Sequence, residues 1–268
     1  MDLHLSDRVA VVTGASKGIG LAITRTLVIE GARVVATSRK STPDLDALLG
    51  PAVLHVAADL MDPDAPAMVL ARAEEAFGGV DILVNNAGGP PPGVTFPRGS
   101  FLDATDDDWR ATVEFNLFSA VRAVRAAIPL MLKRGGGSII NVSSMMAWQP
   151  SPTNLDYCAA KAAMTSAAKG LSEEFAPRGI RVNTVSPGPV RTPWWTDAGG
   201  VADMFAAQAS ADRDTVLDTI VPESMRLSTG RMVDPQEVAD AVALLASPRS
   251  ASTTGADFIV DAGCLKSV

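Results

Sequence analysis

Tyr157 and Lys161 stand four residues apart in this sequence, and Tyr157 is the only tyrosine in the chain. At helical spacing the two side chains lie on one face, one turn apart, so the phenol and the ammonium can act together. A free phenol has a pKa of about 10, and we expect the lysine charge to favour the phenolate and lower that pKa. A tyrosine tuned in this way can act as a general acid or base.

The composition excludes several other kinds of chemistry and partner. The 268 residues include two histidines and two cysteines, and these scarce residue types predict no metal site. Cys158 and Cys264 cannot form the disulfide framework of a small secreted domain, which indicates a reducing compartment. A net charge of −7 argues against nucleic acid as a partner. Because we find neither a signal peptide nor an apolar run of the roughly 20 residues that a membrane span needs, we expect a cytoplasmic protein with no membrane partner.

A glycine-rich segment, TGASKGIG, follows the first apolar run and opens a helical pattern. Gly14, Gly18 and Gly20 permit a tight turn, and a helix N-terminus offers free N–H groups and a positive dipole end to a pyrophosphate. A P-loop is excluded because Gly20 is followed by Leu21 instead of lysine. The segment therefore predicts a dinucleotide-binding turn.

The elements that must position these residues alternate between strand and helix. Seven short apolar runs rich in valine and isoleucine predict strands at 9–12, 34–36, 53–57, 82–84, 139–142, 182–185 and 258–260. Helical spacing falls between them, at 19–30, 67–77, 109–133, 154–176 and 235–246. Such alternation predicts an α/β fold, a single Rossmann-like doubly wound domain over residues 1–268 with a seven-stranded parallel sheet and helices on both faces.

Two segments interrupt this alternation, the loop GGPPPGVTFPRGSF after the fourth strand and residues 193–230 after the sixth. Ligands of such sheets bind beyond the carboxyl ends of the strands, so both insertions are placed to border a site.

Several motifs in order resemble the short-chain dehydrogenase/reductase family over essentially the whole length: TGASKGIG at 13–20, ADL at 58–60, NNAG at 85–88, NVSS at 141–144, YCAAK at 157–161 and PGPVRT at 187–192. The resemblance implies a nicotinamide cofactor, a homotetramer or homodimer, and a catalytic set of asparagine, serine, tyrosine and lysine. These four fall on Asn116, Ser144, Tyr157 and Lys161, with Ser143 the less favoured serine. In the implied reduction, hydride passes from the nicotinamide to a carbonyl carbon while Tyr157 protonates the oxygen, and Ser144 hydrogen-bonds it. Lys161 would hold the nicotinamide ribose, and Asn116 would organise a water chain to the tyrosine.

The cofactor type is predicted from the end of the second strand. Members that prefer NAD usually carry an acidic residue there, whereas this sequence has Ser38 followed by Arg39, with Lys17 in the glycine segment nearby. A guanidinium suits a phosphate, so we expect NADP(H). A solvated surface pair is the plainer interpretation of the two cations. The resemblance places these cofactor-binding residues: Gly14, Ser16, Lys17, Gly18, Ile19, Gly20, Ser38, Arg39, Asp59, Leu60, Asn86, Ala87, Gly88, Tyr157, Lys161, Pro187, Gly188, Val190 and Thr192.

Residues 193–230 match the family's mobile substrate lid. Trp194 and Trp195, together with Met145 and Trp148 just after Ser144, predict an apolar pocket for a small-molecule carbonyl or alcohol. The same residues could equally pack the lid onto the body.

The family implies an NADP(H)-dependent carbonyl reductase or alcohol dehydrogenase, and two alternatives stay open. A 3-oxoacyl-(acyl carrier protein) reductase would present a basic patch to its acidic partner, and Lys133, Arg134 and Arg178 could supply one. A catalytically silent dinucleotide-binding sensor would be favoured by loss of one of the four catalytic residues, and none is lost.

Overall fold

Seven parallel strands form one sheet in the computed structural model of the chain, in which residues 1–266 are described. The order across the sheet is β3-β2-β1-β4-β5-β6-β7. The predicted strands are confirmed, most of them extended by one to three residues: β1 Val9–Thr13, β2 Arg33–Ser38, β3 Val53–Ala57, β4 Ile82–Asn85, β5 Gly137–Val142, β6 Ile180–Pro187 and β7 Asp257–Val260.

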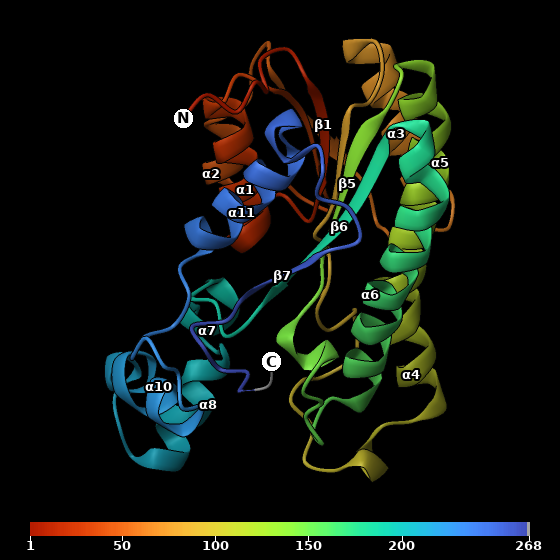
Figure 1. Ribbon diagram of the computed structural model, residues 1–268. Coiled ribbons are helices and arrows are strands. Elements are labelled where there is room, and N and C mark those ends of the chain that lie inside the picture. The colour runs from red at the N-terminus through yellow and green to blue at the C-terminus, as the bar shows by residue number, and fades with distance from the viewer. Residues whose placement is uncertain (267–268) are drawn as a thin grey trace.

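Helices cover both faces of the sheet, as the continuous apolar strands predict. The predicted helices appear as α1 Gly18–Ile29, α3 Ala65–Phe77, α6 Leu155–Phe175, α11 Pro235–Ala246 and the long helix described below, and a short α2 at Pro43–Asp46 was not predicted. Figure 1 shows α1, α2 and α11 on one side of the sheet and α3, α5 and α6 on the other.

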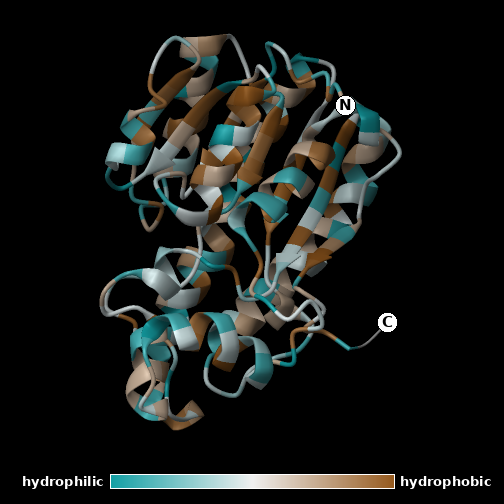
Figure 2. Cartoon of the chain, turned by 90° about the vertical axis from the view of Figure 1, so that its left-hand side faces the viewer, coloured by the Kyte–Doolittle hydropathy of each residue, from teal (hydrophilic) through white to brown (hydrophobic). Residues whose placement is uncertain are grey.

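Successive residues of one strand face opposite layers, because side chains alternate along a strand. In β1, Ala10 and Val12 pack with α1 and α11, whereas Val9 and Val11 pack with α3, α5 and α6. Figure 2 shows the resulting hydrophobic sheet at the centre of the larger part of the molecule. Packing of helices on both faces holds the sheet, and with it the carboxyl ends of the strands, in place.

A single long helix follows β4 and its loop, and it is made of α4 Asp106–Val113, a π-helical turn η2 Glu114–Phe118 and α5 Ser119–Lys133. Its 28 residues have a mean hydropathy of 1.3 over the most apolar stretch, so by length and composition it could cross a membrane. It is not an uninterrupted apolar run of about 20 residues, because Glu114, Arg122 and Arg125 lie within it. Its apolar residues Ala123, Ala127 and Met131 are buried in the core with α3 and the sheet, which accounts for the hydropathy.

The segment 193–230 is built from short helices: α7 Pro193–Thr196, α8 Val201–Ala209, α9 Arg213–Thr215, η5 Val216–Ile220 and α10 Val221–Ser224. It has an apolar cluster of its own, in which Trp195 packs on Phe205 with ring centres 6.0 Å apart. A parallel bridge between Val190 and Val233 joins the two ends of the segment. This segment, called the lid below, follows the carboxyl end of β6 and lies beyond that end of the sheet (Figure 1).

The strand order reverses between β1 and β4, because the chain runs outward to β3 and then returns to the other side of β1. Ligands of doubly wound sheets bind at such a point, beyond the carboxyl ends of the strands. The glycine segment follows β1, Asn86 follows β4, Ser144 follows β5 and Gly188 follows β6. One edge of the sheet thus collects four of the predicted motifs.

Candidate active site

The glycine segment after β1 forms a tight turn that tolerates no side chain at two of its positions. A Cβ atom at Gly20 would lie 2.2 Å from the carbonyl oxygen of Gly14, and Gly14 itself has a φ of +66°. The Asn86 amide donates hydrogen bonds to the carbonyl oxygens of Thr13 at 2.8 Å and of Gly14 at 3.2 Å. NNAG therefore fixes the shape of the glycine turn from the neighbouring strand.

The N-terminus of α1 fits a phosphate group. The residue at its N-cap, Lys17, makes no capping hydrogen bond with its side chain, so N–H groups of the first turn are left for another acceptor. Thr192 lies over this turn, 3.3 Å from where a Cβ of Gly18 would stand. The Lys17 ammonium also approaches the Asp197 carboxylate of the lid at 3.9 Å. The start of the lid thus borders the dinucleotide turn.

At the end of β2, Arg39 and Lys40 are exposed and Ser38 is half-buried. The Ser38 hydroxyl donates to the Lys40 carbonyl at 2.9 Å and lies 3.0 Å from Nε2 of His55 on β3. This strand end carries a hydroxyl and a guanidinium with no acidic residue among 38–40, a set that fits a phosphomonoester better than a ribose diol.

The predicted catalytic residues from β5 and α6 lie together. Tyr157 is half-buried in the first turn of α6, Lys161 is buried one turn later, and the Lys161 Nζ atom lies 5.7 Å from the centre of the tyrosine ring. The Ser144 hydroxyl interacts with the phenol and accepts a hydrogen bond from the Met146 N–H at 3.1 Å. Ser143 instead donates to the Lys161 carbonyl at 3.2 Å, so Ser144 is the serine that faces the tyrosine.

The expected lowering of the tyrosine pKa is wrong. Burial raises the pKa of Tyr157 to about 12, and the hydrogen bond from Ser144 only partly opposes this rise. Burial also lowers the pKa of Lys161 to about 8. The Lys161 Nζ atom donates to the Val142 carbonyl at 2.8 Å, so its charge is directed to the β5 backbone.

Asn116 lies within the π-helical turn η2 and is fully buried. Its Oδ1 accepts from the Gly89 N–H at 2.8 Å, and its Nδ2 donates to the carbonyls of Gly89 at 2.9 Å and Thr112 at 3.0 Å. A Cβ at Gly88 would stand 2.9 Å from Lys161 Nζ and 3.0 Å from Asn116 Oδ1. Asn116 therefore holds the segment after β4 against the lysine, and one lone pair of Oδ1 is left for water.

The other predicted cofactor residues lie around this edge, several with a clear structural use. The Ala87 N–H and the Asn86 N–H both donate to the Thr13 hydroxyl. Gly188 packs so closely on Asp261 that a Cβ would come within 2.7 Å of its Cα. These remaining residues are placed as follows: Ser16 and Ile19 half-buried in the turn, Asp59 exposed, Leu60 buried, Pro187 at the end of β6 and Val190 buried at the base of the lid.

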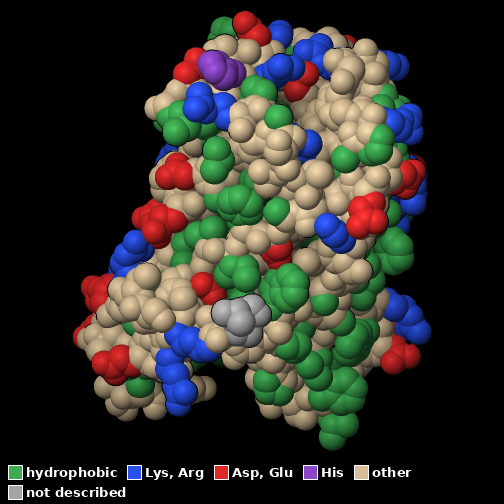
Figure 3. All heavy atoms as spheres, in the orientation of Figure 1, with side chains coloured by type: hydrophobic (Ala, Val, Ile, Leu, Met, Phe, Trp, Pro, Cys, Tyr) green, Lys and Arg blue, Asp and Glu red, His purple; other side chains and the backbone are tan. Residues whose placement is uncertain are grey.

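The four residues predicted for a substrate pocket have different surroundings. Met145 is buried against the lid core, and Trp195 is buried within it, 8% exposed. Trp194 is 41% exposed. Trp148 is also exposed, with its indole N–H donating to the Asp257 carboxylate at 2.7 Å. Figure 3 shows a notch between the lid and the part of the molecule that carries α4 and the start of α6, where hydrophobic side chains gather.

Three further residues adjoin the tyrosine without belonging to any motif. Phe96 packs edge-to-face on Tyr157, with ring centres 5.8 Å apart. Arg98 forms a buried ion pair with Asp156, the residue directly before Tyr157. The sequence held no signal for Phe96 or Arg98 beyond their place in the insertion after the fourth strand.

The basic residues considered as a carrier-protein patch lie elsewhere. Lys133 pairs with Glu74 at 2.9 Å, and Arg134 pairs with Asp81, which also accepts from the Val9 N–H. Asp81 stands where β1, β4 and β5 begin, so these two cations lie at the opposite edge of the sheet from Ser144. Arg178, the third residue considered for the patch, is exposed.

Comparisons with known proteins agree on one family. The family model described as Enoyl-(Acyl carrier protein) reductase matches residues 14–264. The 3-oxoacyl-[acyl-carrier-protein] reductase FabG of Vibrio cholerae is 36% identical over 264 residues, covering 97% of this chain and 98% of the relative. The uncharacterized oxidoreductase YvrD of Bacillus subtilis is 34% identical over 278 residues and covers all of both chains.

Among solved structures, L-sorbose reductase from Gluconobacter frateurii complexed with NADPH and L-sorbose has a TM-score of 0.90, with 34% identity and complete coverage of both chains. Aldohexose dehydrogenase from Thermoplasma acidophilum has a TM-score of 0.84 with 28% identity, covering 98% of this chain and 96% of the other. The predicted Rossmann-like sheet and the oxidoreductase class are confirmed by these likenesses. The chain belongs to the short-chain dehydrogenase/reductase family.

Proposed function

We propose that the protein is an NADP(H)-dependent reductase of a small carbonyl compound, with Tyr157 as its general acid and base. The observation that carries the proposal is the grouping of Tyr157, Ser144 and Lys161 at the sheet edge where the glycine turn offers its N–H groups. NADP(H) would lie with its pyrophosphate on α1 and its 2′-phosphate by Ser38 and Arg39. When bound, it supplies hydride to a carbonyl carbon or accepts hydride from an alcohol.

The protein's own residues manage the proton and the oxygen. Because burial holds the pKa of Tyr157 at about 12, the phenol is protonated near neutrality and ready to donate to a developing alkoxide. Ser144 orients the substrate oxygen toward the phenol. Lys161 and Asn116 keep the strand-end segment in place, and the free lone pair of Asn116 can hold a water that restores the proton.

The direction of the reaction then depends on pH. Reduction needs the phenol that is present at neutral pH, whereas oxidation needs that phenol to lose a proton. We expect reduction to predominate near neutrality and oxidation to become faster as pH rises.

Ketoses are the first substrates to test, because the structure with a TM-score of 0.90 belongs to an L-sorbose reductase. A second candidate is a 3-oxoacyl thioester, since FabG proteins are among the relatives. Lys133 and Arg134 pair with carboxylates at the far edge of the sheet, so their charges are partly neutralised as a docking patch for an acidic carrier protein.

A screen of NADPH oxidation with L-sorbose, simple ketones, quinones and acetoacetyl-coenzyme A tests the proposal. We expect turnover with at least one ketone or ketose, and faster turnover with NADPH than with NADH. NADPH binding with no turnover on any carbonyl would instead favour the dinucleotide sensor.

We further propose a homodimer or homotetramer that pairs through the long helices α5 and α6, and a cytoplasmic location. Phe118, at the start of α5, is 45% exposed and could be covered by such a pairing. Both cysteines are buried and unpaired, which suits a reducing compartment. Light scattering that found a monomer would contradict the assembly.

A further inference from the structure

A phenylalanine ring lies between the proposed catalytic tyrosine and an arginine. Phe96, in the loop after β4, meets the Tyr157 ring at an interplanar angle of 68° and is itself buried. The guanidinium carbon of Arg98 lies 4.9 Å from the centre of the same Phe96 ring. Edge-to-face and cation–π contacts both depend on the relative placement of their partners, so the position of Arg98 is transmitted to the tyrosine ring.

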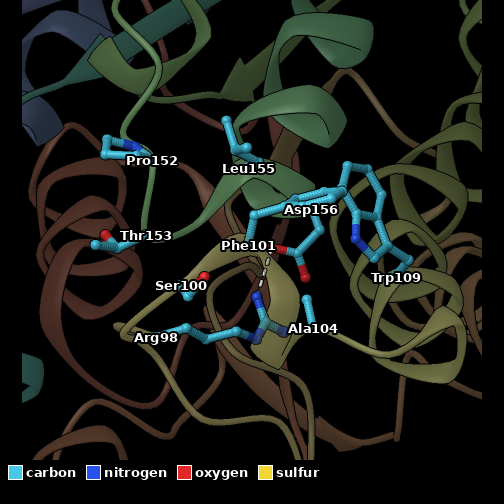
Figure 4. A pocket seen from close by; sticks show the side chains of 9 residues that line it. All are labelled: Arg98, Ser100, Phe101, Ala104, Trp109, Pro152, Thr153, Leu155 and Asp156. Atoms are coloured by element: carbon cyan, nitrogen blue, oxygen red, sulfur yellow. Dashed lines mark hydrogen bonds and ion pairs between the residues drawn. The ribbon is translucent and has the colours of Figure 1, made fainter.

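Arg98 is fixed by a buried ion pair with α6. Its Nη1 lies 2.7 Å from Oδ1 of Asp156, and the two side chains are 7% and 0% exposed. The Arg98 N–H also donates to the Thr153 carbonyl at 3.2 Å. Figure 4 shows the Arg98 guanidinium directed at the Asp156 carboxylate. Loss of either charge would leave the other buried without compensation.

Asp156 connects this pair to the helix that carries Asn116. Its second oxygen accepts from the Thr112 hydroxyl at 2.7 Å, and the Thr112 carbonyl accepts from the Asn116 amide. Asn116, Thr112 and Asp156 are all buried. An unbroken polar chain therefore runs from Asn116 to the residue that precedes Tyr157.

The side chain at the N-cap does not restrain the first turn of α6. Asn154 occupies the N-cap, but its side chain makes no capping hydrogen bond, and its Oδ1 is buried without a partner among residues 1–266. Helix ends fray when they are not capped. Tyr157 belongs to this turn. The turn is therefore held by the bonds of the Asp156 carboxylate to Arg98 and Thr112, and not by the side chain of the N-cap residue.

We propose that Arg98 and Asp156 are positioning residues that hold the Tyr157 phenol in its reactive orientation, Arg98 acting through Phe96 and Asp156 through the first turn of α6. The inference rests on the proposed role of Tyr157. It does not require the substrate to be known, because the state of the phenol can be measured in the free protein.

The test compares Arg98→Gln with a matched control, Arg134→Gln. Arg134 also pairs with a buried aspartate, Asp81, but at the opposite edge of the sheet. If Arg98→Gln fails to fold, Thr112→Val takes its place in the test. This substitution removes the hydroxyl that donates to the Asp156 carboxylate and keeps the shape of the side chain. Because Tyr157 is the only tyrosine, the phenolate absorbance on alkaline titration reports on it alone. Circular dichroism follows the fold through the same titration.

We expect Arg98→Gln to admit water to the phenol, so its pKa falls from the raised value toward the ordinary one of about 10. Lys161 and Cys158 of α6 lie beside the phenol and are unchanged by the substitution, whereas the adjacent Asp156 loses its cation. An unpaired Asp156 charge would raise the phenol pKa, so a fall in that pKa reports water that reaches the phenol. With the best substrate of the screen, kcat should fall about 10- to 100-fold, because small misplacement of a catalytic group has costs of this size. The Kd for NADPH, from nicotinamide fluorescence, should stay within about twofold.

Arg98→Lys should restore part of both effects, since it keeps a positive charge opposite Asp156. Arg134→Gln should lower stability with no change in the phenol titration or in kcat. The proposal is overturned if the phenol of folded Arg98→Gln titrates as in the wild type, or if Arg134→Gln moves it equally. If no carbonyl substrate is ever found, the proposed function fails, while the phenol titration still decides on this inference.

Discussion

The Nζ atom of Lys161 lies 5.7 Å from the centre of the Tyr157 ring, yet its hydrogen bond goes to the Val142 carbonyl. The charge of Lys161 was expected to set the pKa of Tyr157, but burial is the main cause of the pKa shift of each residue. The tyrosine pKa is raised and the lysine pKa is lowered, because burial disfavours the charged form of each side chain. A bound ribose or substrate oxygen would give the lysine charge a partner on the tyrosine side.

Burial of Lys161 makes the stability of the free protein depend on pH. The folded pKa is about 8 against 10.5 for an ordinary lysine, so the cost of burying the charge is full below pH 8 and disappears as pH rises toward 10.5. We expect the free energy of unfolding of Lys161→Met to exceed that of the wild type by the most below pH 8. Between pH 8 and pH 10.5 this difference in free energy should decline by about 3 kcal/mol. Urea unfolding at several pH values measures it. A difference independent of pH would mean that burial leaves the pKa of Lys161 at its ordinary value.

Two helical glycines should respond oppositely to alanine. At Gly20 the new Cβ would stand 2.5 Å from the Asn86 amide nitrogen as well as close to the Gly14 carbonyl, so Gly20→Ala should abolish NADPH binding. At Gly170, on the exposed side of α6, a Cβ meets nothing within 4 Å. Gly170→Ala should raise the free energy of unfolding by about 0.5–1 kcal/mol. Titration with NADPH and thermal unfolding check both, and an active Gly20→Ala would refute the tight turn.

Cofactor preference should depend on Arg39 more than on its neighbour Lys40, although both are exposed. A lost guanidinium contact to phosphate is worth about 1.5–3 kcal/mol, so Arg39→Ala should raise the KM for NADPH about tenfold or more. The KM for NADH should change little. Lys40→Ala is the matched control, with an expected change within about twofold. Equal effects of the two substitutions would show a diffuse charge effect in place of a specific contact.

The two adjacent tryptophans of the lid should separate substrate binding from packing. Trp195→Ala removes a ring from the lid core and should destabilise the protein by about 3–5 kcal/mol. Trp194→Ala should leave stability nearly unchanged, since the ring is 41% exposed, and should raise the KM for the carbonyl substrate. Thermal unfolding and steady-state kinetics distinguish the two. An unchanged KM in Trp194→Ala would place the substrate away from the start of the lid.

The sheet could be predicted from the sequence because its inner strands are buried on both faces and form apolar runs, as at Val9 to Val12. The edge strands β3 and β7 are only partly buried, but they are also apolar runs. Ser144 could be favoured over Ser143 only through a family spacing, and the structure gives the reason, since Ser143 is bonded to the α6 backbone. The contact of Phe96 with Tyr157 could not be predicted, because they are 61 positions apart and no pattern couples them. The π-helical turn around Asn116 likewise depends on its bonds to Gly89 across the fold.

Substitution of Tyr157 by phenylalanine tests the central claim most directly, because it removes one hydroxyl group and keeps the ring that packs on Phe96. Loss of a general acid typically costs about 10²- to 10⁴-fold. The decisive measurement is kcat for NADPH-dependent ketone reduction by Tyr157→Phe, alongside the Kd for NADPH. We predict a fall in kcat of that size with the Kd unchanged within about twofold, whereas wild-type kcat in the variant would contradict the assignment of Tyr157.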